Sequence, residues 1–81
     1  DGVKDARHIS MDEEMEIAGM RYKLIGLIQH IGRRSDGGHY IAFVKDESQQ
    51  WWKCDDEYIV RTSWTNVRNR EAYVLYYRRM E

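Results

Sequence analysis

Residues 38–44 read Gly-His-Tyr-Ile-Ala-Phe-Val, a glycine followed by a run in which the side chains alternate between two faces. In a strand, successive side chains point to opposite sides. His39, Ile41 and Phe43 therefore share one face, and the residues between them occupy the other. The polar residues 46–50 separate this run from a second one, Trp51–Cys54. The pattern predicts a β-hairpin with its turn near residues 46–50.

The hairpin brings a histidine and a carboxylate together. A turn near residues 46–50 places position 41 roughly opposite position 55, so His39 lies one diagonal step from Asp55. Diagonal neighbours in an antiparallel pair are about 7–8 Å apart, within reach of an imidazole and a carboxylate. In this register His39 and Asp55 share a face, whereas Cys54 and Asp56 point to the other.

Such a pair has a recognisable chemistry. A histidine that acts as a general base keeps one ring nitrogen towards its nucleophile, while the other donates to a group that fixes its tautomer and orientation. Gly37 and Gly38 permit a tight turn before His39 and leave room beside the imidazole. The spacing alone also fits a hairpin whose histidine and aspartate are ordinary polar residues at strand ends.

The rest of the chain predicts a mostly antiparallel sheet of four or five strands, paired sequentially. Gly26 in the apolar run 22–31 suggests a bulge or a close backbone approach. The expected elements are a buried central strand over Tyr22–Ile31, a turn over residues 32–38, short strands over Glu57–Arg61 and Ala72–Arg78, an irregular turn with a possible helical segment over Thr62–Arg70, and a connector or poorly formed strand over Met11–Ile17.

Composition excludes several classes of function. The net charge is −1, from 13 basic and 14 acidic residues, so the chain lacks the basic surface expected of a nucleic-acid or membrane binder. No apolar run is long enough to span a membrane, and the start is not a signal peptide. The single cysteine, Cys54, excludes an internal disulfide and a multi-cysteine metal site. We expect no metal or cofactor, and an intracellular location in the cytoplasm or nucleus. The absence of an initial methionine suggests a piece of a longer protein.

Four blocks in this order resemble the C-terminal "histidine box" of the ubiquitin-specific proteases, which are papain-like deubiquitinases. The blocks are Tyr-Lys-Leu-Ile-Gly-Leu-Ile-Gln-His-Ile-Gly at 22–32, Gly-His-Tyr-Ile-Ala-Phe-Val at 38–44, Trp-Lys-Cys-Asp-Asp at 52–56 and Ala-Tyr-Val-Leu-Tyr-Tyr at 72–77. The match runs from about Arg7 to Arg79, and residues 8–11 resemble the strand that precedes the box. The resemblance implies the α+β fold of a papain-like cysteine protease, with residues 1–81 forming the mostly antiparallel β palm segment.

The resemblance also implies roles for individual residues. His39 corresponds to the general base, Asp55 to the orienting carboxylate and Asp56 to a second acidic position that assists the site in some members. Gly37 and Gly38 would border the channel for the Gly-Gly terminus of the substrate, which Tyr40, or alternatively Trp52, would flank.

By the same resemblance, the intact enzyme hydrolyses the bond after the C-terminal glycine of ubiquitin. Its partners are ubiquitin or ubiquitinated proteins and the remainder of the catalytic domain. The catalytic cysteine belongs to an N-terminal box that is absent here, so we expect the isolated chain to be inactive.

One departure from the family concerns Cys54, which stands where an aromatic residue usually precedes the aspartate pair. Because Cys54 adjoins Asp55 and faces away from His39, we expect a small buried hydrophobe rather than the nucleophile. We expect His30 to be a satisfied structural histidine and the three tryptophans to pack in the core or at its edges. Two alternatives stay open: a β-rich module that binds ubiquitin, a peptide or nucleic acid through its aromatic residues, and an inactive relative that binds ubiquitin without cleaving it.

Overall fold

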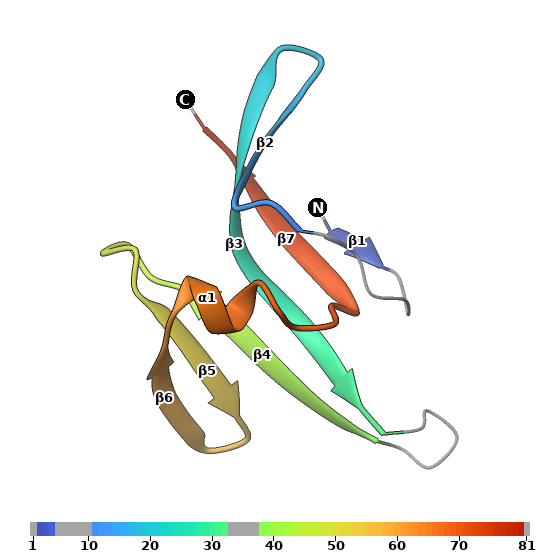
Figure 1. Ribbon diagram of the computed structural model, residues 1–81, viewed down its shortest axis with the longest axis vertical. Helices are drawn as coiled ribbons and strands as arrows, with labels where there is room; N and C mark the ends of the chain where they lie inside the picture. The colour runs from blue at the N-terminus through green and yellow to red at the C-terminus, as the bar shows by residue number, and fades with distance from the viewer. Residues whose placement is uncertain (1, 5–10, 33–37, 81) are drawn as a thin grey trace.

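The computed structural model describes residues 2–4, 11–32 and 38–80. Within them, the chain forms a seven-stranded antiparallel sheet and one short helix (Figure 1). The strands lie in the order β1-β7-β3-β4-β5-β6, with β2 paired to β3 outside this path, so β3 is the central strand. The elements are β1 (Gly2–Lys4), β2 (Glu14–Ile17), β3 (Met20–Ile31), β4 (His39–Lys45), β5 (Trp51–Asp55), β6 (Tyr58–Thr62), α1 (Trp64–Val67) and β7 (Val74–Arg79).

A bulge in β3 decides which of its residues are buried. The register with β7 shifts between Leu24 and Gly26, which leaves one extra residue on β3. An extra residue reverses the alternation of faces, so Leu24 and Leu27 both reach the core and are 0% and 1% exposed. A Cβ at Gly26 would lie 3.2 Å from the Phe43 carbonyl oxygen. The predicted bulge and close backbone approach at Gly26 are both confirmed.

The core lies on one face of the sheet, beneath α1 and the segment that follows it. In Figure 1 this helix crosses in front of the sheet. Val67 of α1 is fully buried, and the Trp64 ring stacks on Trp51 with ring centroids 5.9 Å apart. The buried cluster comprises Met11, Leu24, Leu27, Ile41, Phe43, Trp51, Val67, Ala72 and Leu75.

The opposite face of the sheet is also apolar. The registers align one row of side chains across five strands: Ile59, Cys54, Ala42, Ile28 and Val74. On this face Ile59 is 62% exposed, and Val44 and Tyr76 of the next row are each 43% exposed. Antiparallel sheets with one solvated face usually place polar residues there. The apolar composition of this face is therefore unusual for a surface in contact with water.

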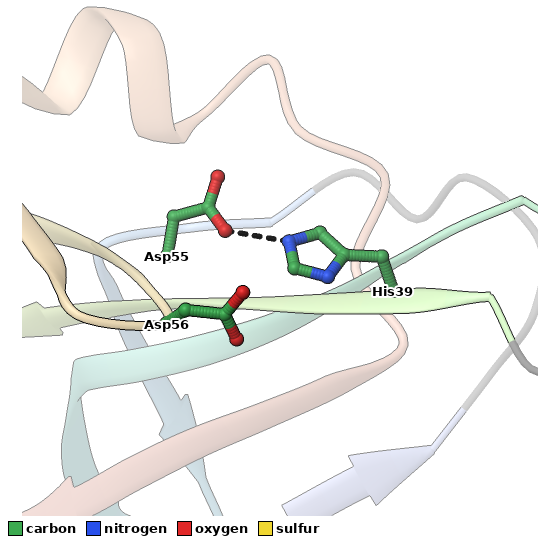
Figure 2. Close-up of side chains that lie close together, drawn as sticks. All are labelled: His39, Asp55 and Asp56. Carbon is green, nitrogen blue, oxygen red and sulfur yellow. Dashed lines mark hydrogen bonds and ion pairs between the residues drawn. The ribbon is translucent and has the colours of Figure 1, made fainter.

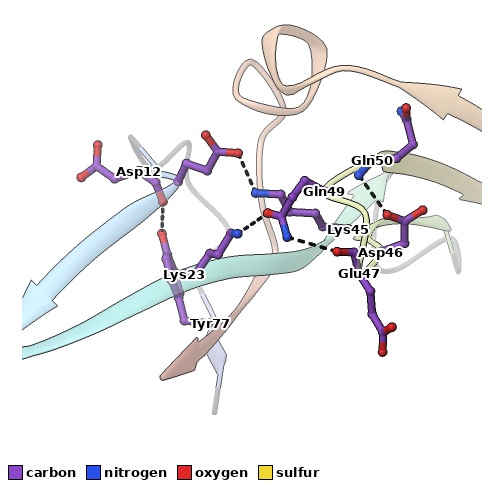
Figure 3. Close-up of polar contacts among 9 residues, drawn as sticks. Asp12, Lys23, Lys45, Asp46, Glu47, Gln49, Gln50 and Tyr77 are labelled. Atoms are coloured by element: carbon purple, nitrogen blue, oxygen red, sulfur yellow. Dashed lines mark hydrogen bonds and ion pairs between the residues drawn. The ribbon is translucent and has the colours of Figure 1, made fainter. Parts of the chain in front are cut away.

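Polar contacts fix the segment 11–13, which precedes β2, against the sheet (Figure 3). The Tyr77 hydroxyl donates to the Asp12 carbonyl oxygen at 2.7 Å, and burial raises the pKa of this phenol above its ordinary value. Lys45 Nζ lies 2.8 Å from Glu13 Oε2, and the lysine side chain is only 5% exposed. These contacts hold Met11, the first residue of the buried cluster, over the sheet.

Asp46 organises the turn between β4 and β5. Its carboxylate accepts hydrogen bonds from the backbone N–H groups of Ser48 and Gln50, at 2.8 and 3.0 Å, and from Trp52 Nε1 at 2.8 Å. The Trp52 hydrogen bond is the largest of the effects that lower the pKa of Asp46 below its ordinary value. The turn predicted over residues 46–50 thus owes its shape to one aspartate.

The predicted and observed elements agree best in the hairpin. β4 has the predicted bounds, β5 is one residue longer than predicted, and β6 is displaced by one residue. The expected number of four or five strands was wrong, because β1 was not predicted and β2 is a regular strand. Sequential pairing holds from β2 to β6 but fails for β7, which lies between β1 and β3. The lead-in at residues 7–10 lies outside the described residues.

Candidate active site

The β4–β5 hairpin has the predicted register. Ala42 pairs with Cys54 and Phe43 with Lys53, so one step further along the ladder Ile41 faces Asp55. His39 begins β4 and Asp55 ends β5, on the same face as the core. Hairpin geometry therefore brings these two side chains to one end of the sheet.

The two side chains are in hydrogen-bond contact (Figure 2). His39 Nε2 lies 2.5 Å from Asp55 Oδ1, and the side chains are 42% and 35% exposed respectively. In a neutral imidazole, one ring nitrogen carries the proton and the other is basic. When Nε2–H donates to the carboxylate, Nδ1 is left as the basic nitrogen. The geometry can therefore orient a general base and stabilise its protonated form.

The predicted direction of the Asp56 side chain was wrong. Strict alternation placed its side chain on the face opposite His39, but Figure 2 shows its carboxylate beside the imidazole. One donor atom from each of His39, Asp55 and Asp56 lies within 4.8 Å of the other two. Asp56 has left the strand in the left-handed conformation, with φ of 53°, in the tight turn before β6. That turn brings the second carboxylate back towards the site.

Within the described ranges, the ligand atoms of these three residues also lie close enough together to hold a cation. Imidazole and carboxylate ligands suit several divalent metals. Here Nε2 is already bonded to Asp55, so a metal would bind at Nδ1 or displace that hydrogen bond.

The residues predicted to contact substrate have separate placements. Gly37 lies outside the described residues. Gly38 has φ of +65° and packs against the ring of His30, a contact that was not predicted from the sequence. Tyr40 is 49% exposed on the face opposite His39, with its ring centroid 4.6 Å from that of His30. His30 pairs with Tyr40 in the β3–β4 ladder, and this pairing would have indicated that His30, Gly38 and Tyr40 lie together. It could not be predicted because the loop between the strands does not specify their register.

Cys54 and two of the tryptophans have the expected placements, whereas His30 differs from expectation. Cys54 lies on the face away from His39, as predicted, although it is half-buried rather than buried. Trp51 and Trp64 pack in and against the core, as expected. The Nε2 atom of His30 is buried and has no hydrogen-bond partner among the described residues, which differs from the expected satisfied histidine.

Solved structures define the class of protein. The chain is similar to the structure of the Ubp8-Sgf11-Sgf73-Sus1 SAGA DUB module, with a TM-score of 0.83 and 30% identity, over 90% of this chain and 18% of that one. A SAGA DUB module bound to monoubiquitin is similar with a TM-score of 0.82 and 28% identity, over 91% of this chain and 18% of the other. The fold is the β-rich segment of a papain-like cysteine protease.

The sequence then identifies the family within this class. The family model for ubiquitin carboxyl-terminal hydrolases matches residues 3–77, and the chain belongs to that family, the ubiquitin-specific proteases. Ubiquitin carboxyl-terminal hydrolase 23 of Arabidopsis thaliana is 42% identical over 58 residues, which are 72% of this chain but 7% of the relative. The chain thus spans a small part of the proteins it matches. In the described residues, no helix has the length and apolar character needed to cross a membrane.

Proposed function

We propose that this chain supplies the general base and the orienting carboxylate of a thiol-dependent deubiquitinase, which hydrolyses peptide or isopeptide bonds after the C-terminal glycine of ubiquitin. The observation that carries the proposal is the 2.5 Å contact between His39 Nε2 and Asp55 Oδ1, half-exposed at one end of the sheet. Membership of the hydrolase family gives this geometry its chemical context.

His39 moves protons in both halves of the proposed reaction. A cysteine of the remaining protease domain transfers its proton to Nδ1 of His39, and the thiolate attacks the carbonyl carbon of the last glycine. The C–N bond then breaks, and His39 returns the proton to the leaving amine. In the second half, a water molecule gives a proton to His39 and attacks the thioester, and the proton passes to the departing thiolate.

The two aspartates act on the imidazole. Asp55 holds the ring with Nδ1 towards the nucleophile and stabilises the imidazolium that forms in each half of the reaction. Asp56, whose carboxylate lies in the same cluster, adds a second negative charge near that imidazolium. Coulomb attraction at this separation is modest where water has access, so Asp55 carries the larger role.

The proposal places residues 1–81 in the C-terminal, histidine-bearing part of the protease domain. The remainder of the domain is the expected partner and carries the cysteine, so the chain alone has no peptidase activity. Two observations support this division. The similar SAGA DUB chain is several times longer, since this chain covers 18% of it. The exposed apolar face with Ile59, Val44 and Tyr76 also suits burial against further protein.

The substrate side of the proposal involves three residues. Gly37 and Gly38 would border the channel that admits the Gly-Gly terminus of ubiquitin, with Tyr40 along its wall. The ring of Tyr40 is 49% exposed and so is accessible to a partner, although it lies on the face opposite His39. A reducing compartment, the cytoplasm or nucleus, belongs to the proposal because the nucleophile must stay a free thiol.

The test uses the intact protein that contains this chain and a ubiquitin whose C-terminus carries a thiol-reactive electrophile. We expect labelling of the unaltered protein and its loss in His39→Ala. Glu57→Gln is the matched control, because Glu57 is exposed in the turn beside Asp56 and should be labelled normally.

Two outcomes would contradict the proposal. Labelling that persists in a folded His39→Ala protein would show that this histidine is not the base. If the unaltered protein bound ubiquitin without being labelled or cleaving it, the chain would belong to an inactive relative.

A further inference from the structure

The ring of His30 lies directly behind the start of the strand that carries His39. His30 pairs with Tyr40 in the β3–β4 ladder and Ile31 pairs with His39, so His30 projects from the face opposite the candidate base. Its ring centroid is 4.6 Å from that of Tyr40 and 6.1 Å from that of Tyr73. These aromatic contacts fix the plane and position of the imidazole.

Gly38, the residue immediately before His39, packs directly on this ring. A Cβ at position 38 would overlap His30 Nε2, would lie 2.6 Å from Cε1 and would lie 2.9 Å from the Ile31 carbonyl oxygen. Separations this short do not occur between real atoms of these kinds. Only glycine fits between the imidazole and the backbone, and the left-handed φ of +65° requires glycine for a second reason.

The imidazole of His30 is half-buried. Its Nε2 has no hydrogen-bond partner among the residues that the structure describes. A buried polar atom without a partner destabilises a fold, and such atoms in native structures call for a specific explanation.

We propose that His30 is a positioning residue for His39, which acts through Gly38. Among the described residues, Ile31–His39 is the last pair of the β3–β4 ladder, so His39 stands at the end of the paired part of β4. The His30 ring, which packs on Gly38, restrains the backbone at this point and fixes where β4 begins. It thereby fixes the distance between the His39 ring and Asp55. This inference rests on the proposed function of His39.

The test compares variants of the intact protein in the hydrolysis of a fluorogenic ubiquitin C-terminal amide. His30→Ala should lower kcat by roughly tenfold, since displacements of about 1 Å at a catalytic group can cost as much as a hundredfold. KM should change by less than about twofold because the His30 ring does not bind the substrate. His30→Asn keeps the near half of the side chain but lacks the Cε1 and Nε2 atoms that meet Gly38, so the same loss is expected.

Ile28→Ala is the matched control for packing. Ile28 is half-buried two residues earlier on the same face of β3, but it pairs with Ala42 and does not contact Gly38. It should lower stability and leave kcat unchanged. The cost of Gly38→Ala in kcat should also be at least about fivefold smaller in the His30→Ala background, because the ring that its Cβ would strike has gone.

The outcomes separate this inference from the proposed function. Unchanged kcat in a folded His30→Asn protein, or equal losses in Ile28→Ala, would overturn the positioning role even if His39→Ala is inactive. Strictly multiplicative effects of Gly38→Ala and His30→Ala would also overturn it. Activity that survives in His39→Ala would refute the proposed function itself.

Discussion

Replacement of Asp55 by asparagine separates the two effects of the carboxylate on His39. The amide oxygen of asparagine can still accept a hydrogen bond from Nε2–H, so the ring keeps its orientation but loses the negative charge beside it. Opposite unit charges about 4 Å apart attract by about 1 kcal/mol in water and about 4 kcal/mol at an effective dielectric constant of 20. The side chains of His39 and Asp55 are 42% and 35% exposed, which favours the lower half of that range.

A loss of about 2 kcal/mol corresponds to roughly a 30-fold decrease in kcat/KM. Asp55→Ala removes the orientation as well, and we expect a further decrease of about tenfold or more. The assay is hydrolysis of a fluorogenic ubiquitin C-terminal amide by the intact protein, with Glu57→Gln, in the turn that follows β5, as the control for loss of one acidic charge. Equal activity of Asp55→Asn and the unaltered protein would refute the electrostatic argument. If Asp55→Asn were as inactive as Asp55→Ala, the claim that the amide preserves orientation would be wrong.

Three further predictions concern stability, each measured by urea unfolding of the intact protein. Leu27→Ala should lower the free energy of unfolding by about 2–5 kcal/mol because Leu27 is 1% exposed in the core, and a loss below about 1 kcal/mol would contradict its place there. The Trp52 hydrogen bond lowers the pKa of Asp46 from its ordinary 3.8. A lowered folded pKa stabilises the fold above the unfolded pKa, so Asp46→Asn should be less stable than the unaltered protein at pH 7. That deficit should vanish as the pH falls through the folded pKa, and a deficit independent of pH would contradict the assignment. Burial raises the pKa of Tyr77 from 10.0, so this phenol stabilises the fold below pH 10 and loses its effect as the pH rises through the folded pKa. Tyr77→Phe should therefore weaken the loss of stability in alkali, and an unchanged alkaline transition would count against the burial argument.

The hairpin could be predicted from sequence because its information is local. The alternation in residues 39–45 and the polar turn after it specify both the strand bounds and the register, and Ala42 does pair with Cys54. A register error of one residue would have moved His39 and Asp55 to opposite faces. The turn itself contains Asp46, whose side chain bonds two backbone N–H groups within it. Local chemistry and strand alternation therefore agree, and together they place the His39–Asp55 pair.

Features that depend on contacts between distant segments, or on irregular backbone, could not be predicted from local sequence patterns. β7 lies between β1 and β3, a placement that depends on packing of distant segments rather than on any pattern within residues 74–79. In β3 the glycine indicated a bulge, but periodicity could not show that Leu24 and Leu27 would end on the same face. Asp56 illustrates the same limit at the candidate active site. Its face follows from a left-handed backbone conformation in a tight turn, which strand alternation does not describe.

Under the proposed function, the site is divided between this chain and the rest of the protease domain, and the half in this chain can be inferred from its 81 residues. The orientation of the His39 imidazole depends on the hairpin from His39 to Asp55 and on the His30 ring that packs on Gly38. Both lie within this chain. Reactivity, in contrast, depends on where a thiol is held relative to Nδ1, and the proposal places that thiol elsewhere in the protease domain. Because His39 and Asp55 are already in contact, aligning the base with its nucleophile has a lower entropic cost. Only the distance between Nδ1 and the thiol is left to set.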